Sequence, residues 1–550
     1  MRQSDLNKSK KLKNLLPALL PPAALCFLWT IYSPLELLYG NGTDLPYNMY
    51  TLLGYMLPAF IVLTLCLSGG LRLAEKRSSG AYRICTAVAA GLLTASYIEG
   101  TYLAGNLPPL DGREISWSSY TKEALISAAV WAVVIAAAVV LSRVIPAGKW
   151  KKIITGFSAV MLLLLAVVIL ITCISTEGYH RNNGILQSDT YLFDMSEKEN
   201  LVILLLDSVD GAGFREVTEK HPEYAEILED FTSFDNVMSG YPYTSRSIPF
   251  ILSGQWYENE QPYRDYCTEA FTHSPLFAKL KTEGYRAGFY DPGFSFVLEL
   301  EDMFENISKA PFFASPFRFA ALQLKMTGYR YLPFALKKYC AVTPGEISKA
   351  TLRSNGIEGY YSWENEFFLD RLETKGITLS GEKCFRYIYL YGAHVPFIYP
   401  AQNPDFEDCS FESSMEMCMT LTEKYLQALK DSGVYDDTAI VILSDHGYAE
   451  NDASWGRQHP FLLIKGRHEK HPFAVSSAPL SHEDLQDAFL KLIDGAKSSE
   501  LFPWEEGSER DRRYLYCRYG AEDTLEEYDQ TGSADCTETM TATGRVYARN

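Results

Sequence analysis

The chain has 550 residues, 47% of them hydrophobic, and a net charge of −18. Residues 1–175 carry 15 Lys and Arg against 8 Asp and Glu, a net of +7, so the remaining residues carry −25. An acidic domain of this kind lacks the basic surface that neutralises phosphates, which excludes nucleic acid as a partner. This uneven distribution of charge is typical of a membrane region whose spans are flanked by Lys and Arg, followed by an acidic soluble domain.

Five segments of the N-terminal region carry enough apolar residues to cross a bilayer, which takes roughly 20. They are 15–39, 49–71, 82–104, 124–145 and 153–172. The first follows a basic leader but is too long for the apolar core of a signal peptide, so we expect it to be retained. Glu99 falls in the outer third of the third segment. An acid there can mark a functional path, but close to a helix end it more commonly reaches the membrane interface.

The distribution of Lys and Arg predicts the orientation of these segments. Both residue types cluster before the first segment, in 72–83 and in 143–152, whereas the alternate loops 40–48 and 105–122 are poor in them. The positive-inside rule therefore places the N-terminus in the cytoplasm. Because the number of spans is odd, we expect a multi-pass protein of the cell membrane whose C-terminal domain is extracytoplasmic.

The rest of the chain alternates strand-like and helix-like segments. The predicted strands are 201–206, 285–290, 384–391, 438–443 and 461–464, and the predicted helices are 274–283, 356–372, 415–429 and 481–492. Strands separated by helices predict an α/β domain with a central, mostly parallel sheet between helices. The expected organisation is a transmembrane domain of five helices over 1–175, a linker over 176–199, the α/β domain over 200–500 and a C-terminal extension over 501–550, whose Tyr-rich end is expected to form a small sheet.

Two of the predicted strands deliver acids to one edge of the sheet. The apolar run 201–206, typical of a strand buried on both faces, leads directly into Asp207. The strand 438–443 is followed, one residue later, by Asp445 and His446. Ligands of such sheets bind beyond the carboxyl ends of the strands, and two carboxylates with an imidazole suit Zn²⁺ or Mn²⁺ better than Ca²⁺. The alternative is that each acid caps the turn after its strand.

A segment rich in hydroxyl groups, Tyr-Thr-Ser-Arg-Ser-Ile-Pro-Phe-Ile-Leu-Ser-Gly at 243–254, is the third part of the candidate site. Its hydroxyls precede a short apolar stretch that is typical of a helix start. Thr244 is either the N-cap of that helix or a metal ligand whose lowered pKa makes its oxygen a nucleophile. The sequence leaves these two interpretations open.

These motifs carry a resemblance to a known family. The strand ending in Asp207, the Thr-x-x-Ser-x-Pro-x-x-x-Ser-Gly segment from Thr244 and the late Asp445-His446-Gly, behind five membrane spans, resemble the alkaline phosphatase/sulfatase superfamily. The most similar branch is that of the membrane-anchored phosphoglycerol and phosphoethanolamine transferases, the lipoteichoic acid synthase-like enzymes. The resemblance implies that the catalytic domain takes a phospho-headgroup from a membrane phospholipid and passes it to an envelope glycan or polymer.

Position by position, the resemblance implies a metal shell of Asp207, Thr244, Asp445 and His446, with Thr244 as the catalytic nucleophile. The implied metal is Mn²⁺ or Zn²⁺, with Mg²⁺ left open. The transferase branch usually has Glu at the first of these positions, whereas this chain has Asp207, as sulfatases have Asp there. Sulfatases, however, follow this Asp with a second Asp, and this chain has Ser208 in its place. The loss of that second acid indicates a single-metal site.

The resemblance also implies groups that contact the substrate. His394, in a His-x-Pro sequence, and His459, in the Gln-His-Pro that follows the Asp-His pair, match the family's substrate histidines. The alternative for each taken alone is an ordinary interface histidine, but their places after a strand and after the Asp-His pair favour the substrate role. Arg246 and Asp291 are further candidates for substrate binding. Formylglycine sulfatases need a Cys/Ser-x-Pro-x-Arg frame, and counting back from Arg246 places Pro242 at the Cys or Ser position, so this chemistry is not expected.

Two alternatives to the transferase remain open. With water as the acceptor the protein would be a sulfatase-like phosphodiesterase or sulfuric-ester hydrolase. A non-catalytic, lipid-binding envelope regulator on the same fold would be expected to have lost metal ligands or the nucleophile, and all of these residues are present in the chain.

Overall fold

The chain divides into two compact units. The computed structural model describes residues 3–41, 45, 47–108, 110, 115–176, 178–179, 184–309, 315–342, 346, 361–449, 455–518 and 523–548. The first unit comprises residues 1–184 together with 310–356, and the second comprises 185–309 together with 357–550. The chain therefore passes from one unit to the other three times.

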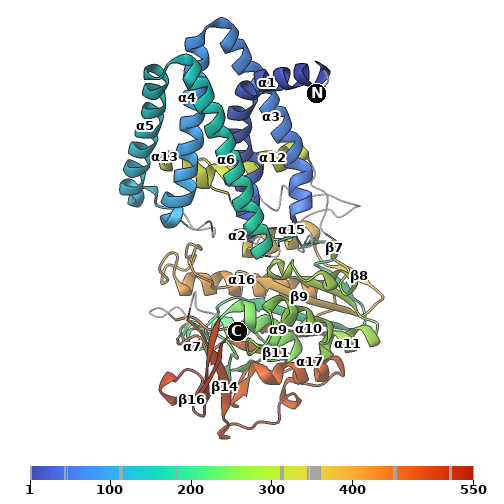
Figure 1. Ribbon diagram of the computed structural model, residues 1–550. Coiled ribbons are helices and arrows are strands. Elements are labelled where there is room, and N and C mark those ends of the chain that lie inside the picture. The colour runs from blue at the N-terminus through green and yellow to red at the C-terminus, as the bar shows by residue number, and fades with distance from the viewer. Residues whose placement is uncertain are drawn as a thin grey trace. The chain divides into compact units, whose positions relative to one another are not determined.

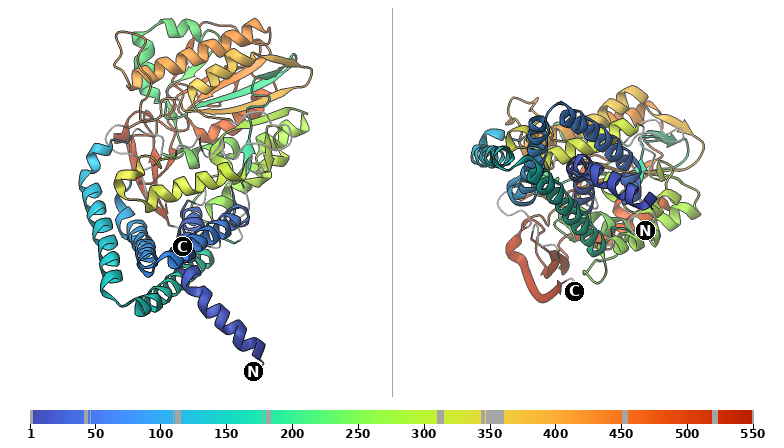
Figure 2. Two further views of the ribbon diagram at one scale, coloured as in Figure 1. Left: turned by 90° about the horizontal axis from the view of Figure 1, so that it is seen from above. Right: turned by 45° about the horizontal axis from the view of Figure 1, so that its top comes forward.

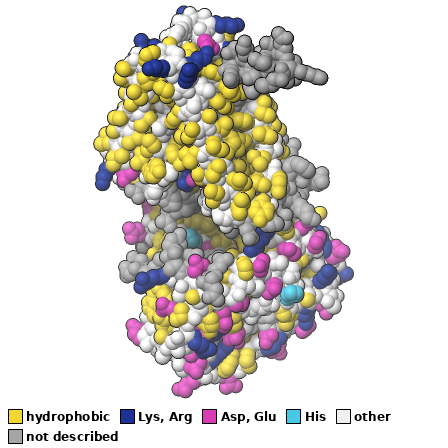
Figure 3. All heavy atoms as spheres, viewed as in Figure 1, with side chains coloured by type: hydrophobic (Ala, Val, Ile, Leu, Met, Phe, Trp, Pro, Cys, Tyr) yellow, Lys and Arg dark blue, Asp and Glu magenta, His cyan; other side chains and the backbone are white. Residues whose placement is uncertain are grey.

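The first unit contains five helical segments that are long and apolar enough to cross a membrane, which confirms the five predicted spans (Figure 1). They are Leu15–Gly40, Met49–Arg77, Ser79–Leu103, Trp117–Val144 and Ala147–Ser175. Their elements are α1 (Gln3–Phe27), the π-helical turn η1 (Leu28–Tyr32), α2 (Ser33–Gly40), α3 (Met49–Arg77), α4 (Ser79–Ile98), the π-helical turn η2 (Glu99–Leu103), α5 (Thr121–Val144) and α6 (Ala147–Ser175). Apolar side chains cover the face of these helices seen in Figure 3, as a lipid-facing surface requires.

The second unit is built on a seven-stranded sheet in the order β12-β4-β11-β10-β3-β9-β6. The strands are β3 (Asn200–Leu206), β4 (Thr232–Phe234), β6 (Arg286–Tyr290), β9 (Cys384–Leu390), β10 (Thr438–Leu443), β11 (Leu462–Lys465) and β12 (Ala474–Ser476). The neighbours β6, β9, β3 and β10 run parallel, as do β4 and β12, whereas β11 is antiparallel to both of its neighbours. The predicted α/β domain with a mostly parallel central sheet is therefore confirmed.

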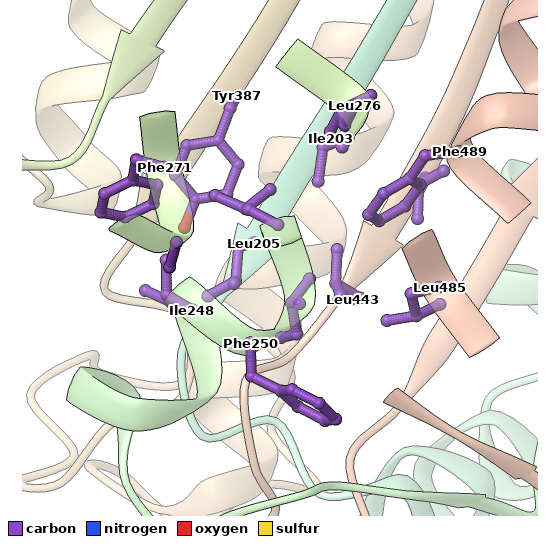
Figure 4. Packing of buried hydrophobic residues seen from close by; sticks show 14 of the residues in the cluster. Ile203, Leu205, Ile248, Phe250, Phe271, Leu276, Tyr387, Leu443, Leu485 and Phe489 are labelled. Carbon is purple, nitrogen blue, oxygen red and sulfur yellow. The ribbon is translucent and has the colours of Figure 1, made fainter. Parts of the chain in front are cut away.

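Helices cover both faces of this sheet. They are α7 (Gly211–Lys220), α8 (Glu223–Ile227), α9 (Thr244–Ser253), α10 (Tyr263–Thr272), α11 (Pro275–Thr282), α15 (Asn365–Lys375), α16 (Phe411–Asp431) and α17 (Leu485–Ile493). Ile203 and Leu205 of β3 pack on one face against residues of α9, α11 and α17 (Figure 4). Val202 and Leu204 pack on the other face against α7, α15 and α16. The strand is thus buried on both sides, as its unbroken apolar sequence predicts.

Smaller sheets flank the central one. Within the predicted linker, β1 (Ile185–Gln187) pairs with β7 (Ile307–Lys309), and β2 (Asp194–Ser196) pairs with β8 (Thr378–Ser380). Strand β5 (Val237–Met238) pairs with β13 (Leu480–Ser481), and the C-terminal strands β14 (Arg512–Tyr516), β15 (Thr524–Gln530) and β16 (Met540–Ala548) form an antiparallel sheet. A small sheet in this Tyr-rich end of the chain agrees with the expectation from the sequence. The first residues of the predicted helix 356–372 lie outside the described residues.

Candidate metal and nucleophile site

Asp207 follows β3 and is held at the carboxyl edge of the sheet by its neighbours. Its backbone N–H donates to the carbonyl of Leu390 at 3.1 Å, and its side chain is only 1% exposed. Oδ1 accepts a hydrogen bond from Oγ of Ser208 at 2.7 Å, and Oδ2 accepts one from the hydroxyl of Tyr389. These bonds fix the orientation of the carboxylate.

Asp445 and His446 reach the same edge because β10 runs parallel to β3, with Leu443 opposite Leu205 in the register. One ligand atom from each of Asp207, Asp445 and His446 lies within 4.8 Å of the other two, and all three residues are buried. Nε2 of His446 lies 3.4 Å from Oδ2 of Asp445 and 3.9 Å from Oδ1 of Asp207. The two strand ends therefore meet.

The donor set fits a divalent cation. Burial, together with the charge of Asp445, raises the pKa of Asp207 to about 7, because two ionised carboxylates cannot share so small a buried volume without a compensating positive charge. Nδ1 of His446 lies 2.8 Å from the carbonyl of Gly447, so Nδ1–H donates there and Nε2 keeps its lone pair. A metal-binding histidine is usually held in this way, with its second ring nitrogen bonded to a carbonyl.

Thr244 is the first residue of α9, and Tyr243, which provides no side-chain cap, precedes it. The Thr244 hydroxyl lies 3.4 Å from Oδ2 of Asp207 and 3.4 Å from Nε2 of His446. Thr244 is therefore not the N-cap of α9, and its oxygen faces the metal-site residues. This arrangement adds a fourth oxygen or nitrogen donor to the set.

Two residues of the site were missed by reasoning from the sequence. Ser208 has a positive φ of 59°, and its N–H donates to Oδ1 of Asp445 at 3.2 Å while its hydroxyl donates to Asp207. It thus contacts both carboxylates, although the sequence pattern showed it only as the position of a lost acid. Tyr389, whose hydroxyl donates to Asp207, lies within β9, and no local motif distinguishes it from a core tyrosine.

The turn after β9 carries His394 and packs against the backbone of Asp207. The N–H of Ala393 donates to the carbonyl of Asp207 at 3.0 Å. Gly392 has a φ of 60°, and a Cβ at this position would overlap the Asp207 backbone, so the close approach requires glycine. The half-buried ring of His394 meets Trp363 edge-on, with ring centroids 6.3 Å apart. His394 is therefore the residue directly after Ala393, whose N–H is bonded to the backbone of Asp207.

Asp291 follows β6 at the carboxyl edge of the same sheet and is 2% exposed. Its carboxylate accepts hydrogen bonds from the N–H of Gly293 at 2.9 Å and from the hydroxyl of Tyr387 at 3.4 Å, and burial raises its pKa to about 7. Arg246 is 7% exposed and stacks over the ring of Tyr257, 5.6 Å from its centroid. The roles of Asp291 and Arg246 in substrate binding stay predictions.

His459 is packed into the turn between β3 and α7. Its Nε2–H donates to the carbonyl of Asp235 at 2.9 Å, and a Cβ at Gly211 would overlap its ring. Burial lowers its pKa, and the Asp210 carboxylate only partly offsets this effect. Within the described ranges, no hydrogen bond joins His459 to the metal-site residues, so its substrate role also stays a prediction.

The site lies in a part of the chain that matches a known family. The sulfatase family model matches residues 199–496, more than half of the chain. No curated protein matches the chain. Among solved structures, a protein of the alkaline phosphatase superfamily from Vibrio parahaemolyticus is 13% identical, with a TM-score of 0.38 over 66% of this chain and 85% of that one.

Two further solved structures, of a transferase and of a synthase, also match the chain. The C-terminal periplasmic domain of the phosphoethanolamine transferase EptC from Campylobacter jejuni is 15% identical, with a TM-score of 0.31 over 56% of this chain and 93% of that one. The lipoteichoic acid synthase LtaP from Listeria monocytogenes is 12% identical, with a TM-score of 0.35 over 65% of this chain and 88% of that one.

The matched residues 199–496 begin just before β3 and end just after α17, so they contain both strand ends and the segment that begins at Thr244. Enzymes of this superfamily depend on metal ions, and the cluster of Asp207, Asp445 and His446 offers the ligands for one. The chain belongs to the sulfatase family and is an enzyme that acts on phosphate or sulfate esters.

Proposed function

We propose that this protein moves a phospho-headgroup, phosphoglycerol or phosphoethanolamine, from a membrane phospholipid to an envelope glycan or polymer through a covalent intermediate on Thr244. The observation that carries the proposal is the position of the Thr244 hydroxyl, 3.4 Å both from Asp207 and from His446. A hydroxyl beside a carboxylate and an imidazole at a helix N-terminus has the surroundings of an activated nucleophile for an anionic substrate.

In the first step, Oγ1 of Thr244 attacks the phosphorus atom in line with its bond to the diacylglycerol oxygen. The new O–P bond forms as that bond breaks. The hydroxyl proton passes through the Asp207 carboxylate to solvent water, and the diacylglycerol oxygen takes up a proton from solvent water as it leaves. An acceptor hydroxyl then attacks the same phosphorus atom, its proton passes to solvent water, and the bond to Thr244 breaks as Oγ1 takes up a proton. The headgroup is thereby transferred, and the threonine hydroxyl is restored.

Asp207, Asp445, His446 and Thr244 would hold one divalent cation. The mixed oxygen and nitrogen donors favour Mn²⁺ or Zn²⁺, with Mg²⁺ open. Such an ion supplies the positive charge that lowers the pKa of a bound hydroxyl and neutralises phosphoryl oxygens. The role of the polypeptide is to orient the hydroxyl of Thr244 with Asp207 and His446.

The proposed topology follows from charge. A cytoplasmic N-terminus, with the sulfatase domain outside, is supported by the clusters of Lys and Arg before the first span, in 72–83 and in 143–152. There the domain would meet lipid headgroups of the outer surface and the glycans or polymers of the envelope. The proposed catalytic domain spans 200–500, with 501–550 as its extension.

Hydrolysis is the second candidate, because water can replace the acceptor in the second step without any change in the site. Sulfate-ester cleavage through formylglycine is disfavoured, since Pro242 stands where that chemistry needs Cys or Ser. A lipid-binding regulator is disfavoured by the assembled cluster of Asp207, Asp445 and His446.

The test is mass spectrometry of the full-length protein after incubation with Mn²⁺ and a mixture of phospholipids. We expect a phosphoglycerol or phosphoethanolamine adduct on the peptide that contains Thr244, and none on the Thr244→Ala variant. Headgroup release by Thr244→Ala at the wild-type rate would contradict the covalent mechanism. Lipid binding without any headgroup release would support the regulator instead. Adding a soluble glycan acceptor and following the headgroup separates transfer from hydrolysis.

A further inference from the structure

A part of the chain that lies between strands of the sulfatase domain belongs structurally to the membrane unit. Residues 310–356 leave the second unit after β7 and return to it before α15. They contain α12 (Pro316–Tyr331) and α13 (Phe334–Lys337), which Figures 1 and 2 show among the membrane helices. α12 packs against α2, α3 and η2, and α13 packs against α5.

All of these contacts lie at one end of the helix bundle. α2 and η2 end the first and third spans. The contacts on α3 and α5 lie near the beginning of the second and fourth spans, where Tyr55 packs against Phe319 of α12 and Ser127 accepts a hydrogen bond from the N–H of Phe334 of α13. Successive spans run in opposite directions, so these four positions share one side of the membrane. The fifth span ends on that side at Ser175 and leads into the second unit.

A buried ion pair joins α13 to the third span. Nζ of Lys337 lies 3.2 Å from Oε1 of Glu99, and both side chains are 0% exposed. Oε2 of Glu99 accepts hydrogen bonds from Ser127 at 2.8 Å and from Trp131 at 3.3 Å. Lys337 also donates to the carbonyl of Tyr329 at 2.9 Å. Because a buried charge is stable only with its partner, this pair specifies one docked position.

A second acid of the spans binds the end of α12. Nη2 of Arg330 lies 2.9 Å from Oε1 of Glu36, and the Tyr331 hydroxyl donates to the same carboxylate. A Cβ at Gly100 would overlap the Tyr331 ring, so the glycine permits this close contact. Glu36 and Glu99 each lie four residues before the end of their spans, at Gly40 and Leu103. Four residues correspond to about 6 Å along a helix. The docking contacts thus lie at the depth of the membrane interface.

The exposed side chains of this segment include aromatic and aliphatic groups as well as basic ones. Phe317 is 86% exposed, Tyr339 is 70% exposed and Leu336 is 45% exposed. Arg318 and Lys338 are their exposed sequence neighbours. Large apolar side chains next to Lys and Arg are typical of segments at the membrane interface, where the rings enter the headgroup region and the cations reach lipid phosphates.

We propose that residues 316–342 are an interfacial anchor that binds the surface of a phospholipid bilayer. The pairs Glu99–Lys337 and Glu36–Arg330 dock it on the spans, and Phe317, Leu336 and Tyr339 enter the lipid. A bilayer is the occupant because the anchor is continuous with helices that themselves span one. The proposal is independent of the chemistry at Thr244. Its role is to attach the sulfatase domain to the membrane at a second point besides the end of α6.

Photo-crosslinking in the full-length protein tests the lipid contact. The variants are Phe317→p-benzoylphenylalanine and Tyr339→p-benzoylphenylalanine in phosphatidylglycerol-containing nanodiscs. The matched control is the same replacement at Val475, which is 55% exposed in the second unit. We expect phospholipid adducts by mass spectrometry at positions 317 and 339 and not at 475. Adducts to protein alone at 317 and 339, or yields no higher than at 475, would overturn the proposal.

Hydrogen–deuterium exchange in the same nanodiscs tests the docking. We expect Lys337→Met to speed exchange in residues 316–342 by roughly a hundredfold or more, because Glu99 is left buried and unpaired. Lys338→Met is the matched control, since Lys338 is exposed, and we expect it to exchange as the wild type does. The double variant Glu99→Gln with Lys337→Met should recover much of the protection. Wild-type exchange in Lys337→Met would refute the docking role.

Discussion

The hydroxyl of Thr244 lies 3.4 Å from Oδ2 of Asp207, although 37 residues separate the two in the chain. The first residue of α9 thereby meets the residue that follows β3, and the same hydroxyl also lies 3.4 Å from Nε2 of His446. The arrangement brings the proposed nucleophile and the side chains that would activate it to one edge of the sheet.

The first prediction concerns Thr244 as the proposed nucleophile. We expect Thr244→Ala to lower kcat for headgroup release by about a thousandfold or more, because no oxygen remains to attack phosphorus. Thr244→Ser keeps that oxygen and should retain most of the activity. Release of a fluorescent headgroup from a phospholipid measures both. Equal losses in the Ser and Ala variants would show that the methyl group, and not the hydroxyl, is what the site needs.

The second prediction concerns the hydrogen bond from Tyr389 to Asp207. Removing a group that orients a metal ligand typically weakens metal binding by about 10- to 100-fold, and we expect this for Tyr389→Phe. Tyr387→Phe is the matched control, because it removes a hydroxyl of the same strand that bonds to Asp291 instead. Titration of the metal-stripped protein with Mn²⁺ gives both affinities. If the two variants bind equally well, the Tyr389 bond has no part in the site.

The third prediction follows from the buried acid Asp291, whose pKa is raised to about 7 by burial. Since this pKa is higher in the folded than in the unfolded chain, the folded state binds the proton more tightly. The stabilisation from Asp291 is therefore complete below a pH of about 4 and is lost as the pH rises to about 7. We expect the Tm of the full-length protein in detergent to fall over this range, and Asp291→Asn to flatten that fall. An unchanged profile in the variant would assign the dependence to other groups.

The fourth prediction concerns the close approach of Gly392 to the backbone of Asp207. Gly392→Ala should lower the free energy of unfolding by about 3 kcal/mol or more and displace Asp207, because it combines a positive φ with an overlap. Gly433→Ala is the matched control, since Gly433 has a φ of 78° but open space where a Cβ would lie. That variant should cost about 1 kcal/mol. Denaturant unfolding compares them, and similar losses would mean that the overlap is relieved without disturbing Asp207.

Much of the fold could be predicted because it depends on properties that are local in the sequence. The apolar run 201–206 is buried on both faces of the sheet, as a strand between two helix layers must be. Five apolar segments became five helices long enough to span a membrane. Asp207 and Asp445 could be placed together because parallel strands end at one edge of a sheet.

The remaining parts depend on packing between segments that are distant in the chain. Residue spacing left open whether Thr244 faces Asp207 or caps α9, and only the family resemblance favoured the first. Neither spacing nor resemblance indicates that Ser208 and Tyr389 hold the carboxylates. Likewise, Lys337 has the composition of an ordinary surface residue, and only the folded chain pairs it with Glu99 inside the membrane unit. The sequence by itself determined the spans, the strands and the donor types, because hydropathy and strand polarity act locally. Which side chains meet was decided by the tertiary structure, because burial, hydrogen bonding and charge pairing are satisfied only between segments that folding brings together.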